Sequence, residues 1–231
     1  MISPRRKHAQ YLRPTPLIDS DNPAVVDFAG DRARNRTSDV DRAVALYHAV
    51  RDEIRYDPYR INLRPDGMRA SATLSREFGF CVTKATLLAA AARAIGIPSR
   101  LGFADVKNHL ATERMLRLMQ TDLFVYHGYT ELYLRDGWIK ATPAFNSSLC
   151  ERFGVEPLGF DGLHDSMFQQ FDRAGNRYME YIRDHGQFAD LPLERIRSAF
   201  EEQYPALMSG GVYSVGGTNE EDAAEDRTTD R

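Results

Sequence analysis

The chain has 231 residues, of which 42% are hydrophobic and 27% charged, and it carries a formal net charge of −3. This composition is that of a globular protein with one sizeable core, and it gives no electrostatic reason to expect nucleic acid as a partner. No apolar run approaches the roughly 18 residues of a membrane-spanning helix, so no membrane partner is expected either.

The two cysteines, Cys81 and Cys150, are too few for a disulfide framework. The segment from Met1 to Lys7 has no apolar signal core, and a reducing, cytoplasmic setting is therefore expected. The six histidines and two cysteines show no metal-ligand spacing. The sequence predicts no metal and no cofactor.

Residues 1–38 are predicted to form an extended arm with one short helix. Four prolines fall within the first 23 residues, which is typical of an extended segment that ends in a turn. Pro23 then opens a helix over residues 24–29, and this helix is expected to stop at Gly30.

A longer amphipathic helix follows the arm. Ser38 or Asp39 caps it, and apolar residues recur at helical spacing as far as Tyr56. Residues 56–72 contain Asp-Pro and Pro-Asp-Gly sequences and are predicted to form a long loop. Loops of this length often carry function, and this one is expected to roof a substrate cleft.

The segment from Ser75 to Arg100 is the most informative part of the chain. Four consecutive alanines, Ala89 to Ala92, lie in a run of strong helix formers and predict a buried helix. Gly96 and Pro98 supply the signals that end it. Cys81 is therefore expected at the N-terminus of this helix.

Cys81 is a candidate nucleophile because the free N–H groups and the positive end of the helix dipole favour a thiolate there. The same N–H groups can stabilise an oxyanion on an attacked carbonyl. Gly79 is expected to allow an unusual backbone turn before the helix. Lys84 either adds positive charge near the sulfur or lays its stem over apolar surface. The alternative is an inert cysteine packed as a small hydrophobic side chain, which is also how Cys150 is interpreted.

Two β-rich runs, residues 123–134 and 138–142, flank an Asp-Gly pair and predict a hairpin. Regular alternation places His127 on the same face as Val125 and Tyr129. If Asp136 and Gly137 form a two-residue turn, His127 lies opposite Asn146. A histidine on such a strand, taken alone, is more often one whose hydrogen bonds are satisfied within the sheet.

The remaining segments complete the predicted organisation. Residues 111–120 read as a short amphipathic helix, and residues 192–204 as a final helix with an apolar stripe. We assign residues 39–146 to the core, residues 147–208 to a C-terminal extension packed on it, and the acidic residues 209–231 to a disordered tail.

The cysteine and histidine segments together resemble the transglutaminase-like superfamily. Gly79 to Ala85, with the Leu- and Ala-rich helix after it, resembles the nucleophile motif of that family. The His-Gly-Tyr-Thr-Glu sequence of residues 127–131 resembles its His-aromatic-Glu strand, and Gly137-Trp138 its next strand. The resemblance implies a papain-like α+β fold, in which N-terminal helices, including a central cysteine-bearing helix, pack on an antiparallel sheet.

The resemblance also implies the roles of the candidate catalytic residues. Cys81 would be the nucleophile, and His127 would be the base that deprotonates it and later protonates the leaving amine. The family's third residue, an aspartate that orients the histidine, falls at Thr142 in this sequence. A threonine can accept a hydrogen bond from imidazole but carries no charge, so weaker catalysis is expected unless another residue replaces it.

Asn146 is one possible replacement, through the hairpin register described above. Asp161 and Asp165 are further possibilities, because the segment after Ser147 can fold back over the site. The choice among these residues stays open at the level of the sequence.

The expected function is cleavage of, or acyl transfer from, a peptide or glutamine-type amide of a peptide or protein substrate through a thioester. Hydrolysis, as a peptidase or deamidase, is favoured over transfer. The alternative is a binding module that keeps the fold with weak or no catalysis, as the threonine at position 142 suggests.

Overall fold

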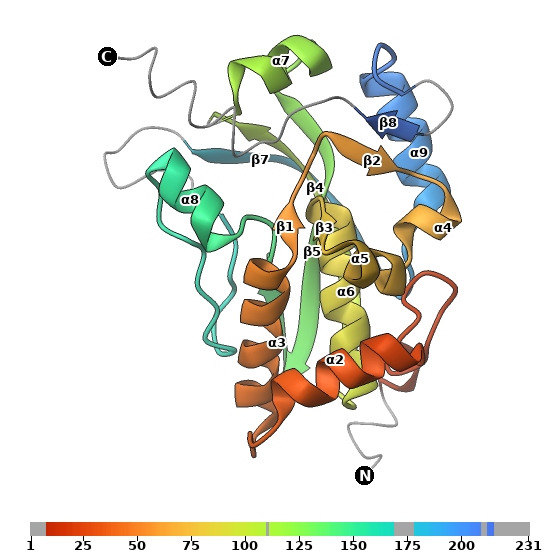
Figure 1. Ribbon diagram of the computed structural model, residues 1–231, viewed down its shortest axis with the longest axis vertical. Helices are drawn as coiled ribbons and strands as arrows, with labels where there is room; N and C mark the ends of the chain where they lie inside the picture. Colours follow the sequence, from red (N-terminus) through yellow and green to blue (C-terminus); the bar gives the residue numbers. More distant parts are fainter. Residues whose placement is uncertain (1–7, 110, 169–177, 209–211, 215–231) are drawn as a thin grey trace.

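The computed structural model describes residues 8–109, 111–168, 178–208 and 212–214 (Figure 1). Most of the predicted acidic tail lies outside these residues. Within that tail, Val212–Ser214 form a short strand, β8.

The helices lie mostly in the first half of the chain. In order they are η1 (Ala9–Tyr11), α2 (Pro23–Ala33), α3 (Asp39–Glu53), α4 (Pro65–Met68), α5 (Ala70–Arg76), α6 (Cys81–Ala94), α7 (Glu113–Met119), α8 (Ser147–Phe153) and α9 (Leu193–Gln203). The strands are β1 (Arg55–Tyr56), β2 (Arg60–Asn62), β3 (Phe78–Gly79), β4 (Ser99–Asn108), β5 (Leu123–Leu134), β6 (Gly137–Ala141), β7 (Met179–Phe188) and β8.

A four-stranded antiparallel sheet in the order β6-β5-β4-β7 forms the centre of the molecule. Helix α6 packs against one face of this sheet, and α2 and α3 pack beside α6 (Figure 1). The hydroxyl of Thr130 on β5 donates to the carbonyl of Ala85 on α6 at 2.8 Å. The predicted class, an α+β fold with a cysteine-bearing helix on an antiparallel sheet, is confirmed. Strand β7 comes from the predicted extension, so the central sheet reaches beyond residue 146.

The N-terminus of α6 is fixed by residues beside it in the sequence. The Thr83 hydroxyl accepts the backbone N–H of Phe80 at 3.2 Å. A Cβ atom on Gly79 would lie 2.4 Å from that hydroxyl oxygen, so this position requires glycine for close approach. The unusual turn expected at Gly79 does not use a positive φ, whereas Gly96 ends the helix with a φ of +83° as predicted.

Two predictions about the N-terminal half are wrong. Helix α2 continues through Gly30 to Ala33, because an isolated glycine costs a packed helix only about 1 kcal/mol. Residues 56–72, predicted as a loop, contain β2, α4 and the start of α5. Strand β2 pairs Ile61 with Tyr213, and a partner so distant in the sequence leaves no local pattern.

The hairpin between β5 and β6 exists, but its turn lies one residue earlier than predicted. Leu134 pairs with Gly137, and the turn residues Arg135 and Asp136 have φ values of 46° and 67°, as a type I′ turn requires. This register pairs Tyr133 with Trp138, whose rings lie 5.3 Å apart. Cross-strand aromatic packing therefore offsets the left-handed backbone at Arg135. Asn146 is consequently not the partner of His127 across the hairpin.

Lys84 connects α6 to the C-terminal end of α3. Its Nζ atom donates to the carbonyl of Arg51 at 2.9 Å and also to the carbonyl of Ile54. The side chain is fully buried. Lys84 therefore neither places its charge on the Cys81 sulfur nor extends over the surface, which corrects both alternatives drawn from the sequence.

Replacing Lys84 with methionine should change how stability depends on pH. Burial lowers the pKa of Lys84 to about 7 from an ordinary value of 10.5, so between these values the unfolded chain binds more protons than the folded chain. The free energy of unfolding therefore rises with pH in this window, by roughly 1 to 2 kcal/mol from pH 7.0 to pH 8.5. Lys84→Met should lose this rise in urea titrations at the two pH values. Lys140→Met, at a partly exposed lysine, serves as the control, and parallel pH profiles for wild type and Lys84→Met would contradict the assignment.

Candidate active site

Cys81 is the first residue of α6, and only 8% of its surface is exposed. Burial raises the pKa of its thiol to about 11, and this effect outweighs the backbone N–H groups of Gly128, Val82 and Cys81, which face the sulfur and lower the pKa. The sequence predicted a helix N-terminus that favours the thiolate. The N–H groups are present as predicted, but burial keeps the sulfur protonated at neutral pH.

Gly128 lets β5 approach the first turn of α6. A Cβ atom at this position would lie 2.9 Å from the Cα atom of Val82, which is closer than real side chains come. Because the residue after His127 has no side chain, its backbone N–H can face the Cys81 sulfur. The sequence signal for this contact is the small residue between the histidine and the aromatic Tyr129.

His127 is 95% buried, and its ring packs edge-on against Phe168 with ring centroids 5.5 Å apart. Burial lowers the pKa of the imidazole to about 4, so the ring is neutral and able to accept a proton. Its Nε2 atom has no hydrogen-bond partner in the described part of the chain. The ordinary interpretation, a histidine satisfied within the sheet, therefore does not account for Nε2.

Cys81 and His127 line the same cavity. The cavity has a volume of about 50 Å³, measured as the space that the centre of a water molecule can occupy. Among the described residues, no charged side chain borders it. Side chains from α7, β5 and α9 form its apolar wall, among them Met115, Phe124, Val125 and Phe200. No hydrogen bond joins the thiol to the imidazole within the described residues, and such bonds often tighten only when substrate binds.

A β-bulge immediately before His127 sets the direction of its side chain. Ala104 pairs with His127 but Val106 pairs with Phe124, so β5 carries one extra residue opposite Asp105. Tyr126, within the bulge, has a φ of 53°. This irregularity breaks the regular alternation that the sequence predicted for β5.

Asp105 stabilises the bulge from the neighbouring strand. Its Oδ1 atom accepts the Tyr126 N–H at 3.0 Å and lies 2.6 Å from Nε2 of His185. The rings of Tyr126 and His185 stack 4.0 Å apart with an interplanar angle of 15°. Asp105 and His185 thus hold the backbone from which His127 projects, and neither residue was singled out from the sequence for this role.

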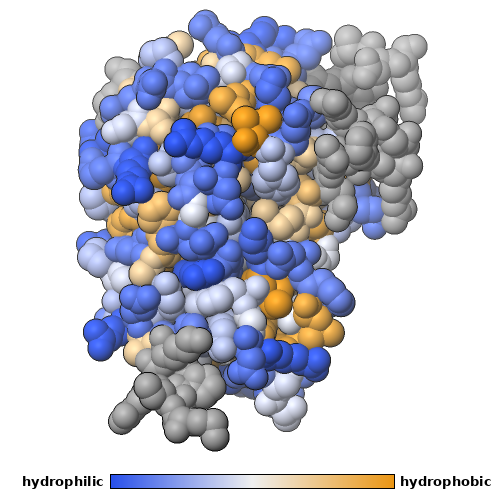
Figure 2. Space-filling view, turned by 180° about the vertical axis from the view of Figure 1, so that it is seen from behind, coloured by the Kyte–Doolittle hydropathy of each residue, from blue (hydrophilic) through white to orange (hydrophobic). Residues whose placement is uncertain are grey.

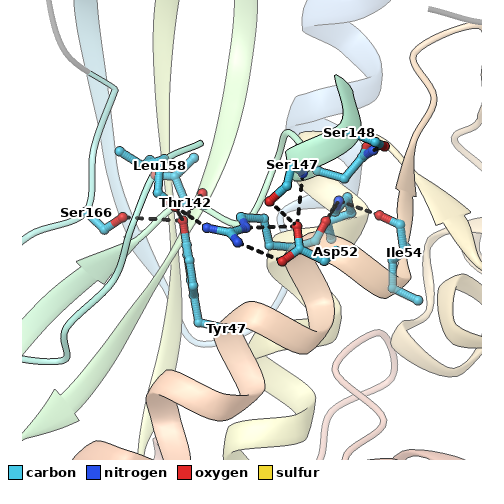
Figure 3. Close-up of polar contacts among 11 residues, drawn as sticks. Tyr47, Asp52, Ile54, Thr142, Ser147, Ser148, Leu158 and Ser166 are labelled. Atoms are coloured by element: carbon cyan, nitrogen blue, oxygen red, sulfur yellow. Dashed lines mark hydrogen bonds and ion pairs between the residues drawn. The ribbon is translucent and has the colours of Figure 1, made fainter. Parts of the chain in front are cut away.

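Thr142 makes its hydrogen bonds to groups other than His127. Its hydroxyl donates to the sulfur of Met167 at 3.4 Å, and its carbonyl accepts the Tyr47 hydroxyl at 3.2 Å. Figure 3 shows Tyr47 also reaching the carbonyl of Leu158 and the side chain of Ser166. These contacts tie the segment after β6 to α3.

Asn146 also makes its hydrogen bonds elsewhere. Its Oδ1 atom accepts the backbone N–H of Tyr56 at 3.0 Å, and its Nδ2 atom donates to Ser148 at 2.7 Å. Asp161 bonds the nearby exposed His164, and Asp165 accepts the backbone N–H of Lys140. Within the described residues, none of the four orienting candidates is hydrogen-bonded to His127.

Other kinds of site find no support in the part of the chain that the structure describes. No three His, Cys, Asp or Glu side chains gather there in a metal-binding arrangement. None of the described helices combines the length and apolarity needed to cross a membrane. Outside the grey atoms, the face in Figure 2 is largely hydrophilic and its hydrophobic patches are small and separate.

A cysteine at the first turn of a central helix, packed on an antiparallel sheet that carries a histidine, is the α+β arrangement that the family resemblance predicted. The sequence model of the transglutaminase-like superfamily matches residues 26–143, just over half of the chain. The chain belongs to the transglutaminase-like superfamily.

Two solved structures are similar at low identity. A proposed cysteine protease from Cytophaga hutchinsonii is 17% identical over 79% of this chain and 54% of its own, with a TM-score of 0.47. A proposed protease from Parabacteroides distasonis is 14% identical over 55% of this chain and 26% of its own, with a TM-score of 0.37. The chain thus spans about half the length of the first and about a quarter of the second. No curated protein sequence matches the chain.

Removing the Asp105 carboxylate should destabilise the bulge. In Asp105→Ala the Tyr126 N–H loses its acceptor, and a buried unsatisfied N–H costs about 1 to 3 kcal/mol in the free energy of unfolding. Asp105→Asn keeps an oxygen that can accept the same N–H, so it should cost less than half as much in urea titrations. Asp184→Ala, at an exposed carboxylate that accepts the Gly186 N–H, is the matched control. Equal losses for the alanine and asparagine variants at position 105 would refute this assignment.

Proposed function

We propose that this protein is a cysteine enzyme that cleaves a peptide or glutamine-type amide through a thioester on Cys81. The observation that carries the proposal is the shared cavity: a thiol on the first turn of α6 and a neutral, buried imidazole on β5 both border it. Membership of the transglutaminase-like superfamily supports a peptide or protein as the substrate. The candidate roles are nucleophile for Cys81 and general base for His127.

The reaction begins with proton transfer from the Cys81 thiol to Nε2 of His127. The sulfur then forms a bond to the amide carbon, and the carbonyl electron pair moves to its oxygen. When the carbonyl re-forms, the bond from carbon to nitrogen breaks and the leaving amine takes the proton from the imidazolium. Water attacks the thioester next, releasing a carboxylic acid and restoring the thiol.

Hydrolysis is the outcome that we favour for this reaction. A water molecule needs only about 10–15 Å³ measured as space for its centre, so the cavity of about 50 Å³ has room for a few waters. A water in this cavity can attack the thioester.

A catalytically weak or inactive binding module is the second candidate. The observation that favours it is the hydroxyl of Thr142, which bonds Met167 in place of the histidine. Burial is the only cause that shifts the pKa of His127, and no carboxylate among the described residues raises it. Catalysis without that charge is expected to be slower by several orders of magnitude than in a complete triad.

The test is iodoacetamide labelling of Cys81, followed by mass spectrometry. Burial raises the pKa values of both the Cys81 and Cys150 thiols to about 11, so unassisted labelling of each should rise steadily from pH 7 to pH 10. If His127 acts as a base, Cys81 should react at least about tenfold faster at pH 7.5 in the wild type than in His127→Gln. Cys150 in the same samples is the internal control for folding and reagent.

A release assay completes the test of the proposed function. Aminocoumarin amides of short peptides should be hydrolysed by the wild type and not by Cys81→Ala or His127→Gln. Labelling that is indifferent to His127, together with no release above the Cys81→Ala background, would leave the binding module as the better description.

A further inference from the structure

Tyr56 borders the cavity beside Cys81, and its hydroxyl plays no part in the site described above. Tyr56 lines the cavity together with Cys81 and His127, and its side chain is 93% buried. By contrast, the hydroxyl of Tyr204 in the same wall accepts the Val125 N–H at 2.7 Å and donates to the Leu123 carbonyl at 2.9 Å. No hydrogen bond to the Tyr56 hydroxyl occurs within the described residues. The hydroxyl oxygen is not one of the fully buried atoms of this region, so a group that enters the cavity can reach it.

The backbone of Tyr56 is held directly beside the turn that leads into Cys81. Strand β1 runs parallel to β3, with Tyr56 paired to Gly79, and the Asp57 N–H donates to the Gly79 carbonyl at 2.9 Å. The Tyr56 N–H is bound by Asn146 at 3.0 Å. Its ring stands edge-on to Phe145 with centroids 4.7 Å apart. Pairing with β3 and the hydrogen bond to Asn146 thus fix the backbone of Tyr56, and packing against Phe145 fixes its ring.

Tyr56 offers a neutral hydrogen-bond donor to the cavity that Cys81 also lines. Burial raises the pKa of the phenol well above its ordinary value, and the charge of a Cys81 thiolate is the next largest cause. The hydroxyl therefore stays protonated at any pH at which the enzyme would work. A neutral O–H in a cavity without charged walls is suited to stabilise negative charge that develops on a substrate.

We propose that Tyr56 is a catalytic residue that donates its O–H to the substrate carbonyl oxygen as the Cys81 sulfur attacks. This inference rests on the proposed function. Tyr56 transfers no proton: the thiol proton goes to His127, the sulfur–carbon bond forms, and the carbonyl electron pair becomes an oxyanion. That oxyanion accepts hydrogen bonds from the Tyr56 hydroxyl and from the N–H groups around the first turn of α6.

Asn146 then acquires a different role from the one expected from the sequence. It does not orient the imidazole, but it positions the strand that carries Tyr56. The competing explanation is that Tyr56 is only a packing residue against Phe145. A packing role depends on the ring and is indifferent to the hydroxyl, so Tyr56→Phe separates the two explanations.

The experiment compares two reactions of Cys81 in the full-length protein. Acylation by p-nitrophenyl acetate passes through an oxyanion, whereas alkylation by iodoacetamide does not. Tyr56→Phe should slow acylation about 100-fold, the typical effect of removing one oxyanion donor, and leave alkylation unchanged. Its melting temperature should be no lower than that of the wild type, because the lost hydroxyl makes no hydrogen bond in the described structure. Tyr178→Phe, at a second buried tyrosine near this region, is the matched control and should behave as wild type.

The possible results distinguish this inference from the proposed function. If His127→Gln slows both reactions but Tyr56→Phe acylates like the wild type, the assignment of Tyr56 is overturned and the proposed function stands. If Tyr56→Phe slows acylation and alkylation equally, its role is structural and the assignment is again overturned. If Cys81 of the wild type is not acylated at all, both proposals fall.

Discussion

The close contact between β5 and the first turn of α6 is the constraint on which the candidate site depends. Gly128 allows the two backbones to meet at a distance that no side chain would permit. This contact places the His127–Gly128 peptide against the sulfur of Cys81, and both side chains border one cavity as a result. The Thr83 cap fixes where α6 begins, and the bulge at Tyr126 fixes where His127 points. The cap and the bulge bring Cys81 and His127 to one cavity only because the helix and the strand approach so closely.

Burial gives the site its electrostatic character. It raises the pKa of the Cys81 thiol to about 11 and lowers the pKa of the His127 imidazole to about 4, so the two groups are neutral together. A neutral pair costs less to bury than a thiolate and an imidazolium. Under the proposed function, charge would separate only when a substrate supplies a carbonyl to receive the sulfur, and the surrounding N–H groups would then stabilise the oxyanion. Apolar side chains from α9 in the wall of the cavity, such as Phe200, limit the water that would otherwise stabilise the charged forms.

The residues expected to complete a triad contribute to the site indirectly. Thr142 joins the network of Tyr47, Leu158 and Ser166 that holds the segment after β6 against α3 (Figure 3). Asn146 binds the backbone of Tyr56. Asp105 lies on the strand beside His127 and acts on the backbone of Tyr126, not on the imidazole. The polar groups around Cys81 therefore fix the main chain that carries the candidate residues, and the described part of the chain leaves Nε2 of His127 without a partner.

The sequence by itself determined the elements whose signals are local. Alanine-rich composition and the Gly96 stop defined α6 from Cys81 onward, and the apolar stripe defined α9. The family resemblance then selected Cys81 and His127 from two cysteines and six histidines. The tertiary structure decided the hairpin register, the direction of Lys84, the bulge opposite Asp105 and the position of Tyr56. These features depend on partners far away in the chain, such as Ile54 for Lys84 and Gly79 for Tyr56. Local propensity contains no information about which distant group will satisfy a buried polar atom, because that choice is made only when the elements pack.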